Sequence, residues 1–509
     1  MPLQTEPEDP LARAAAVELS QPPGNILQRI FGRHLMNAAL LMFLAVALAG
    51  PMSDGSELVR DSDLWWHLAD ARLLFTTHDF IHTEPYSFTV HGVPWINPEW
   101  LAEVPYWIGY RLSGLAGVHL AAIIAFAANL LLVYFRSSSV ARHKGAAFWT
   151  AVLCFPLMAI NGGARTIVIA YLALSVEMIV LNAAEQGRTR TLWLLPPLFC
   201  VWINLHGSWF IGLGLLLLYI VSGLFSIDIG VFKQAAFTAA ERNRLILVFL
   251  STLAACLANP YGWRLVWNPL DMLLNQKLML AVMEEWQPLN LGTVTGKAAV
   301  VFIGLLIVAN CVRARKWKLY EFAFTFVAWY VAFSHVRFVF LACIVTAPWF
   351  ARDMTRSFFG EPNEKTIPAL NALFAVGAAV AVIYLCPSQS ALEKKVDAAF
   401  PMQTIASIQP SWRTFNDYSV AGIMDFDSKP VFMDSRNDVF EHHGVFQDFP
   451  AITNLGDPLR LLDAYRIDHV LIHANTPLAY LLERTKGWRI ETSEGTGDNT
   501  FDLFERSSE

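Results

Sequence analysis

Charged side chains are scarce in this chain. Only 16% of its 509 residues are charged, whereas 55% are hydrophobic and the mean hydropathy is +0.41. A soluble globular domain carries about 25% charged residues. The composition therefore excludes a soluble globular protein and indicates that most of the chain lies in lipid.

Several catalytic signatures are missing as well. The sequence contains no P-loop, no glycine fingerprint of a dinucleotide-binding fold, and neither of the motifs H-E-x-x-H and G-x-S-x-G. Each of these motifs builds one kind of site, such as a phosphate cradle or a zinc-binding helix face. Their absence argues against an ATPase, a dehydrogenase, a zinc protease and a serine hydrolase.

Cysteine pairing and leader processing are not expected either. All six cysteines lie within hydrophobic runs or at their edges, so they provide neither a disulfide framework nor a cysteine-type zinc site. Residues 1–33 are polar and contain prolines, and no short apolar segment with a cleavage site precedes the first hydrophobic run. We therefore expect no cleaved signal peptide, and we expect residues 1–33 to be a disordered cytoplasmic segment.

Long hydrophobic runs dominate what is present. A helix needs about 17 to 25 predominantly apolar residues to cross a bilayer. On this criterion the sequence predicts an α-helical polytopic membrane domain over residues 34–386 with about eleven spans. The runs are 34–50, 114–135, 146–160, 163–183, 191–204, 207–225, 244–258, 298–312, 319–333, 336–350 and 367–386.

Lysine and arginine are distributed unevenly around these runs. If the N-terminus is cytoplasmic, 18 of them fall on the cytoplasmic side, and only six lie in the two long opposite loops, 51–113 and 259–297. Loops on the cytoplasmic side of a membrane are enriched in positive charge. The asymmetry predicts that both long loops and the C-terminal tail lie on the outer face, with a helix of loop 259–297 lying in the interface.

The hydrophobic runs stop after Cys386-Pro387. Residues 430–434 and 469–473 are short apolar runs typical of buried strands, while 458–467 and 477–488 have helical spacing. Strands that alternate with helices indicate a small α/β domain. We therefore predict an α/β domain over residues 387–509 on the outer face.

The first long loop contains two aspartates at D-x-D spacing. Loop 51–113 has nine acidic residues against three arginines, a net charge of -6, which would attract cations and repel nucleic acid. Asp61 and Asp63 would face one side of an extended loop but diverge by about 200° on a helix. A carboxylate near an anomeric carbon can act as a base and stabilise positive charge. The structural alternative is that Asp63 caps a helix that starts at Leu64.

Aromatic and histidine residues follow directly. Trp65 and Trp66 are candidates for stacking on a sugar, although membrane-interface tryptophans are common. His67 follows Asp63 by four residues, so on a helix the two would share a face and allow a divalent metal ion to bind, the alternative being a histidine hydrogen-bonded within the loop. Glu99 is either a second functional acid or a solvated helix start.

Positive charge and histidine also occur at the outer ends of predicted spans. An arginine can bind a phosphate through two parallel hydrogen bonds, and charge at a membrane boundary is often functional. For the arginines and His335 the competing explanation is that the side chains extend to lipid headgroups, and for His206 it is a polar turn at the outer surface. The candidates for substrate binding are Arg165, Arg264, Arg337, His206 and His335.

The order of these segments resembles a family of bacterial multi-spanning proteins related to the GT-C glycosyltransferases. That superfamily includes protein mannosyltransferases, oligosaccharyltransferases and lipid A aminoarabinose transferases. Relatives tend to read R-P-Q where this chain reads Arg165-Thr166-Ile167. The matching segments are DSDLWWHLADARLL, IHTEPYSFT, PWINPEWLAE, WINLHGSW, ANPYGWRLVWNPL, EEWQPLN, HVRFVFL, FNDYSVAGI and PVFMDSR.

The resemblance implies a GT-C-like fold in a bacterial inner membrane. It also implies a polyprenyl-phosphate sugar donor, an acceptor that is a glycan, a lipid or a protein, and a first-loop aspartate as catalytic base, a role that carries over to Asp61 or Asp63. Two other functions stay open. One is a non-catalytic membrane subunit whose outer domain docks a partner or a glycan, and the other is a transporter, whose spans should contain paired charges or broken helices.

Overall fold

The computed structural model describes most of the chain. The described residues are 55–161, 163–312, 315–358 and 384–507, together with Leu373, Val376, Gly377 and Val380. The predicted span 34–50 lies outside them, and the predicted span 367–386 lies largely outside them. The count of eleven spans therefore stays a prediction.

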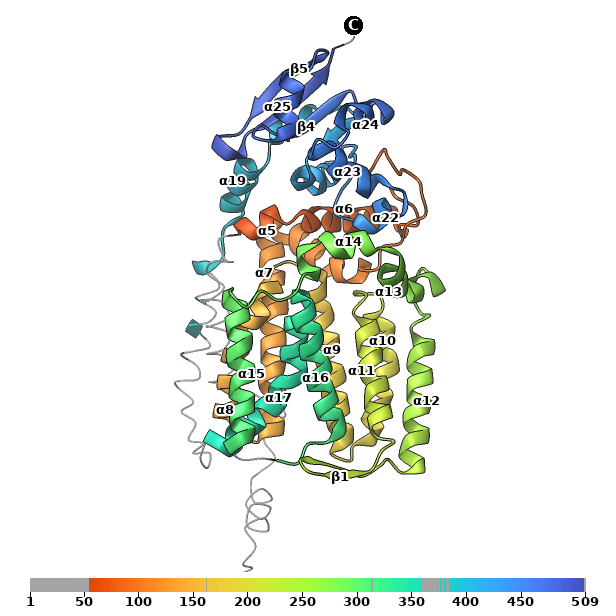
Figure 1. Ribbon diagram of the computed structural model, residues 1–509, viewed down its shortest axis with the longest axis vertical. Helices are drawn as coiled ribbons and strands as arrows, with labels where there is room; N and C mark the ends of the chain where they lie inside the picture. Colours follow the sequence, from red (N-terminus) through yellow and green to blue (C-terminus); the bar gives the residue numbers. More distant parts are fainter. Residues whose placement is uncertain are drawn as a thin grey trace, which may run out of the picture.

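The other predicted spans each correspond to helices, which stand side by side in one bundle (Figure 1). Among the described residues, four segments are long and apolar enough to cross a membrane: Trp100–Ala141, Thr166–Glu185, Val294–Val312 and Val336–Phe358. The helices of the bundle are α7 (Trp100–Ala141), α8 (Lys144–Met158), α9 (Thr166–Glu185), α10 (Leu195–Trp202), α11 (Trp209–Ser222), α12 (Ala239–Ala255), α15 (Val294–Val312), α16 (Leu319–Ser334) and α17 (Val339–Phe358).

Helix α17 is the centre of the bundle. It packs against α7, α8, α15 and α16, and nearly all of its side chains are buried. By contrast, most of α15 is exposed, as expected for a helix at the periphery that faces lipid. The short turn η4 (Val336–Phe338) precedes α17, so the central packing of α17 fixes the position of Arg337 at one end of the bundle.

Helix α6 (Ser62–Thr77) lies across that end of the bundle, after the short helix α5 (Ser56–Arg60) (Figure 1). The prediction that Asp63 caps a helix starting at Leu64 is wrong. Asp61 is the N-cap, because its Oδ1 atom accepts a hydrogen bond from the Asp63 backbone N–H at 3.1 Å. The helix therefore starts at Ser62, and Asp63 lies in its first turn.

The C-terminal segment contains a four-stranded sheet in the order β3-β4-β6-β5, in which only β3 and β4 are parallel. Its strands and helices are β3 (Thr414–Asn416), β4 (His469–His473), β5 (Trp488–Glu494), β6 (Phe501–Arg506), α19 (Gln389–Ala399), α20 (Met402–Ser407), α21 (Ala421–Phe426), α22 (Asn437–His442), α23 (Val445–Thr453), α24 (Pro458–Ala464) and α25 (Pro477–Glu483). Strand β4 and the helices α24 and α25 occur where the sequence predicts a strand and two helices.

The strand predicted at 430–434 is wrong. Only Val431 forms an isolated bridge, and its partner is Ser87 of the first loop rather than a strand of the sheet. The carbonyl of Val431 accepts a hydrogen bond from the Phe88 N–H at 3.0 Å. This apolar run is buried between the first loop and the C-terminal segment, where Phe432 contacts Phe88 and Phe415. The local pattern of apolar residues alone cannot indicate such contacts.

Helix α21 approaches α6 very closely. A side chain at Gly422 would bring its Cβ atom within 2.1 Å of the Ser62 carbonyl oxygen, so only glycine fits there. Trp65 of α6 also contacts Phe426 at the end of α21. The C-terminal segment therefore covers α6 directly, which explains why residues 64–71 are buried all around the helix.

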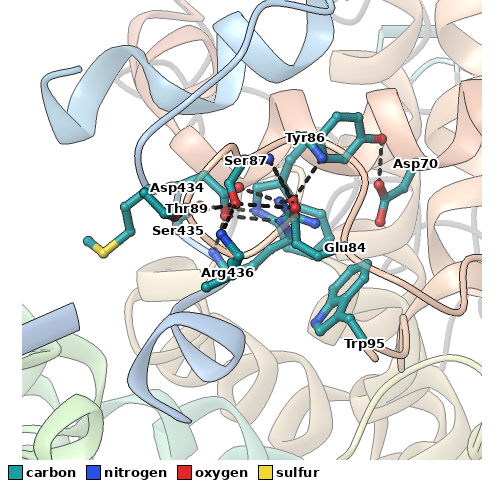
Figure 2. A network of polar contacts seen from close by, with 12 residues as sticks. Asp70, Glu84, Tyr86, Ser87, Thr89, Trp95, Asp434, Ser435 and Arg436 are labelled. Carbon is teal, nitrogen blue, oxygen red and sulfur yellow. Dashed lines mark hydrogen bonds and ion pairs between the residues drawn. The ribbon is translucent and has the colours of Figure 1, made fainter. Parts of the chain in front are cut away.

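Arg436 joins the C-terminal segment to the first loop (Figure 2). Its Nη2 atom lies 2.6 Å from Glu84 Oε1, and its Nε atom lies 3.0 Å from Asp434 Oδ1. The guanidinium also lies over the rings of Tyr86 and Trp95, at 4.8 Å from each. All three charged side chains are buried, so each depends on the others for compensation of its charge.

We expect Arg436→Met to lower the free energy of unfolding by about 3–5 kcal/mol, because it leaves two buried carboxylates without their cation. The thermal unfolding midpoint in detergent measures this loss, together with the rate at which a protease releases the C-terminal segment. Arg484→Met is the matched control, since Arg484 forms an exposed pair with Glu483. Equal midpoints for the two variants would contradict the role of Arg436.

Candidate functional site

A polar cavity of about 170 Å³ opens where α6, the start of α9, loop 259–297 and the C-terminal segment meet. Segments far apart in sequence supply its walls, and acidic and basic side chains face each other across it. The residues that line this cavity include Asp63, Trp66, His67, Trp95, Glu99, Arg165, Thr166, His206, Asn268, Met272, Gln276, Glu285, Trp286, Arg337, Ser435, Arg436, Asn437 and Asp438.

The two aspartates of the D-x-D motif occupy different places. Asp63 lines the cavity, and its Oδ1 atom accepts a hydrogen bond from Trp66 Nε1 at 3.2 Å. Asp61 is the N-cap of α6 and lies 3.5 Å from Arg165 Nε, in a neighbouring hollow with Arg60 and Ser62. Burial raises the pKa of Asp61, while Arg165 acts in the opposite direction. The side chains of Asp61 and Asp63 therefore line two different hollows instead of lying side by side.

The tryptophans next to them face inward. Trp65 donates to the Val59 carbonyl at 2.8 Å and packs against Phe400, outside the cavity. Trp66 lines the cavity, donates to Ser435 Oγ at 3.0 Å, and contacts the tilted ring of His67 with ring centroids 3.7 Å apart. The membrane-interface alternative is wrong for both, because the C-terminal segment covers them.

Glu99 is paired rather than solvated, so the prediction of a solvated helix start is wrong. His206 Nδ1 accepts from the Ser208 N–H at 2.9 Å, which places the imidazole proton on Nε2, 3.2 Å from Glu99 Oε1. Burial lowers the pKa of His206 to about 3, so this histidine is neutral. Thr166 donates to Glu99 Oε2 at 2.6 Å. Burial raises the pKa of Glu99, opposed by His67 and Thr166.

A buried chain of polar contacts continues from His67 away from the cavity. His67 Nδ1 lies 2.9 Å from Glu103 Oε1, and Asn97 Nδ2 donates to both Glu103 (2.8 Å) and Asp70 (3.0 Å). Tyr86 donates to Asp70 at 2.7 Å (Figure 2). Sequence reasoning missed Glu103, although it lies four residues after Glu99 and therefore on the same face of α7.

The ring of His67 is engaged on both sides. Its Nε2 atom lies 3.5 Å from Glu99 Oε2, while Nδ1 faces Glu103. In the described part of the chain, no group of three or more histidine, cysteine, aspartate or glutamate side chains is arranged to hold a metal ion. Metal binding by Asp63 and His67 stays a prediction.

Two arginines, Arg165 and Arg337, form the cationic side of the cavity, and the carboxylate of Glu285 contacts both of them. Glu285, in the turn η3 (Glu284–Trp286), pairs with Arg165 and lies 3.9 Å from Arg337 Nη1. The Arg337 guanidinium lies 4.6 Å from the ring centroid of Trp286. Sequence reasoning missed the contact of Glu285 with these arginines, because residues 165, 285 and 337 share no local spacing.

A second, apolar cavity of about 530 Å³ adjoins the polar one. It lies between α11, α16 and α13 (Trp263–Asn275), and its walls include Ile211 and Val331. Seven residues line both cavities: Pro98, Glu99, His206, Asn268, Met272, Trp286 and Arg337. The two spaces therefore meet at Arg337, and together they fit a ligand with a polar head and a long apolar chain.

The remaining candidates are placed differently. His335 lines only the apolar cavity, and its Nδ1 atom lies 2.6 Å from the Trp286 carbonyl oxygen. Arg264 is exposed on α13 and does not line either cavity. Helix α13 occurs in the loop where we predict an interfacial helix, and it exposes Trp263 and Trp267. After α13, the short helix α14 (Lys277–Val282) contacts α22 of the C-terminal segment.

No family model and no curated protein sequence matches the chain, but solved structures do. The oligosaccharyltransferase of Archaeoglobus fulgidus in its apo form matches with a TM-score of 0.55 at 10% identity, over 86% of this chain and 69% of that one. ArnT from Cupriavidus metallidurans bound to undecaprenyl phosphate matches with a TM-score of 0.50 at 12% identity, over 91% of this chain and 97% of that one.

The chain shares the fold of these two solved structures. A further match is the Archaeoglobus enzyme AglB in complex with an inhibitory peptide and a dolichol-phosphate, with a TM-score of 0.53 at 11% identity, over 88% of this chain and 70% of that one. At these identities the likeness extends to the fold alone, and four of the described helices are long and apolar enough to cross a membrane.

Asp70 makes stability depend on pH. Burial, and then the neighbouring Glu103, raise the pKa of Asp70 to about 8 from its ordinary value of 3.8. Between these values the folded protein holds a proton that the unfolded chain releases, so stability falls as pH rises. The slope for this one proton is at most about 1.4 kcal/mol per pH unit, and it levels off above about pH 8.

We therefore expect Asp70→Asn to weaken the decline of the thermal midpoint between pH 5 and pH 8. Melting curves of both proteins at several pH values in one detergent measure the difference. Asp79→Asn is the control, because Asp79 is exposed and should leave the slope unchanged. Parallel pH profiles for the wild type and Asp70→Asn would show that Asp70 does not hold this proton.

Proposed function

We propose that this protein is an integral-membrane glycosyltransferase that moves a sugar from a polyprenyl-phosphate donor to an acceptor on the outer face of a bacterial inner membrane. The observation that carries the proposal is the meeting of the two cavities at Arg337. A carboxylate, Asp63, lies on the polar side, and an apolar groove for a lipid chain begins on the other.

The donor fits the two cavities in one orientation, with its lipid chain in the apolar cavity and its sugar in the polar one. Its isoprenoid chain occupies the apolar groove between α11, α13 and α16, where apolar walls replace lipid. Its phosphate lies at Arg165 and Arg337, which offer charge-assisted hydrogen bonds. The sugar then enters the polar cavity beside Trp66, whose indole provides an apolar face for a sugar ring.

Asp63 is the proposed base for the transfer. The acceptor hydroxyl loses its proton to the Asp63 carboxylate as its oxygen attacks the anomeric carbon. The bond between that carbon and the phosphate oxygen breaks, and its electron pair stays on the polyprenyl phosphate. The arginines stabilise this leaving phosphate, while carboxylates near the sugar stabilise the positive charge that develops on it.

The C-terminal segment would complete the acceptor side. Ser435, Asn437 and Asp438 line the same cavity as Asp63, so an acceptor glycan, lipid or protein would enter between the first loop and this segment. The charge asymmetry of the loops supports a cytoplasmic N-terminus with residues 387–509 as an outer domain. In that orientation the site lies on the outer face, where we propose that the sugar is transferred.

We expect Asp63→Asn to reduce glycosyl transfer about 100-fold or more, because the amide cannot accept the acceptor's proton. Asp61→Asn is the matched control, two residues away. Asparagine also caps helices well, so this variant should retain substantial transfer. The amount of the cell-surface glycan, at equal protein level, measures both. Normal glycan with Asp63→Asn would end the catalytic assignment and favour a non-catalytic membrane subunit.

A further inference from the structure

We propose that Glu285 occupies the phosphate subsite of the empty protein and competes with the donor, so that it sets the affinity and the headgroup specificity of the site. This inference rests on the proposed function, because it takes Arg165 and Arg337 as the phosphate ligands. The Glu285 carboxylate must leave the arginines before the donor binds. Removing the charge of Glu285 should therefore raise the affinity of the site for the donor.

The geometry resembles that of a bound anion. One carboxylate oxygen of Glu285, Oε1, pairs with Arg165 Nη1, while the other, Oε2, lies 3.9 Å from Arg337 Nη1. A phosphate also presents two or more oxygens that separate arginines can bind. Glu285 therefore uses the same two cations that the donor phosphate needs.

The position along the cavity agrees with this role. Arg337 and Trp286, the residue after Glu285, line both the polar and the apolar cavity, whereas Glu285 lines the polar cavity. A lipid chain in the groove brings its phosphate to this junction. The Glu285 carboxylate and that phosphate would occupy overlapping space, so the two cannot bind the arginines at once.

The backbone next to Glu285 is fixed while its side chain is half-exposed. Val336 N–H donates to the Gln287 carbonyl at 2.9 Å, and Leu289 N–H donates to the Phe333 carbonyl at 3.0 Å. These bonds tie the turn to the residues just before Arg337. The Glu285 side chain is 29% exposed, so it can swing from the arginines into water without moving the turn.

Competition of this kind favours anionic lipids. A polyprenyl phosphate replaces the carboxylate on the arginines and recovers the charge pairing. A neutral polyprenol offers nothing in exchange, so Glu285 stays in place and the arginines remain compensated. The site therefore selects by charge as well as by shape. Ion pairs of this exposure correspond to an affinity change of about 2- to 5-fold.

The test compares binding of undecaprenyl phosphate and of neutral polyprenol to the full-length protein in nanodiscs. We expect Glu285→Gln to bind undecaprenyl phosphate about 2- to 5-fold more tightly than the wild type does. Glu284→Gln is the matched control, since it removes the same charge from the adjacent, exposed residue and should bind like the wild type. Polyprenol should bind all three proteins equally. Glu285→Ala should reproduce the gain, because loss of the carboxylate is what matters.

The possible results separate the two proposals. Equal or weaker binding by Glu285→Gln and Glu285→Ala overturns the competition, while the proposed function stands if the wild type still prefers undecaprenyl phosphate to polyprenol. The same gain in Glu284→Gln also overturns it, because the effect would then come from net charge. A wild type without preference for the phosphate lipid overturns both proposals.

Discussion

The buried ion pairs of Arg436 hold the two halves of the cavity together. Arg436 belongs to the C-terminal segment, and its partner Glu84 belongs to the first loop, 352 residues away in the sequence. Because these charges lie out of water, separating the two segments would expose or isolate them at considerable cost. Next to Arg436 in the sequence, Ser435, Asn437 and Asp438 line the same cavity as Asp63. Without the pairing of Arg436 with Glu84, the polar cavity would lack one wall.

The helix bundle fixes the other walls by packing. Arg165 precedes α9 and Arg337 precedes α17, and both helices are largely buried in the bundle. Both arginines contact Glu285 and therefore lie close together, and α6 crosses this end of the bundle (Figure 1). The apolar groove meets the polar cavity at Arg337, so the proposed position of the phosphate follows from where the hydrophobic layer stops.

The sequence predicts what local patterns determine, and it misses what contacts between distant segments determine. Hydrophobic runs of sufficient length predict the described bundle helices, and β-branched residues predict strand β4. The run 430–434 has the same local pattern, yet it packs on the first loop instead of joining the sheet. Within the motif, Asp61 rather than Asp63 caps α6, a choice between two equally good capping residues two positions apart.

The same division between local patterns and contacts of distant segments applies to the candidate site. Asp63, Glu99, Arg165, His206 and Arg337 are candidates from their residue types and positions, and they line one cavity. Glu103 is detectable only from its helical spacing to Glu99. The pairing of Glu285 with two arginines depends on the folding of three separate segments, and no spacing in the sequence indicates it.

The central claim is that one amphipathic lipid spans both cavities with its phosphate at Arg165 and Arg337. A cryo-electron microscopy structure of the full-length protein with bound undecaprenyl phosphate tests it most directly. We predict phosphate oxygens within hydrogen-bond distance of both guanidinium groups, the isoprenoid chain between α11 and α16, and the Glu285 side chain turned away from the arginines. A phosphate bound elsewhere, with Glu285 still between the two arginines, would contradict the account.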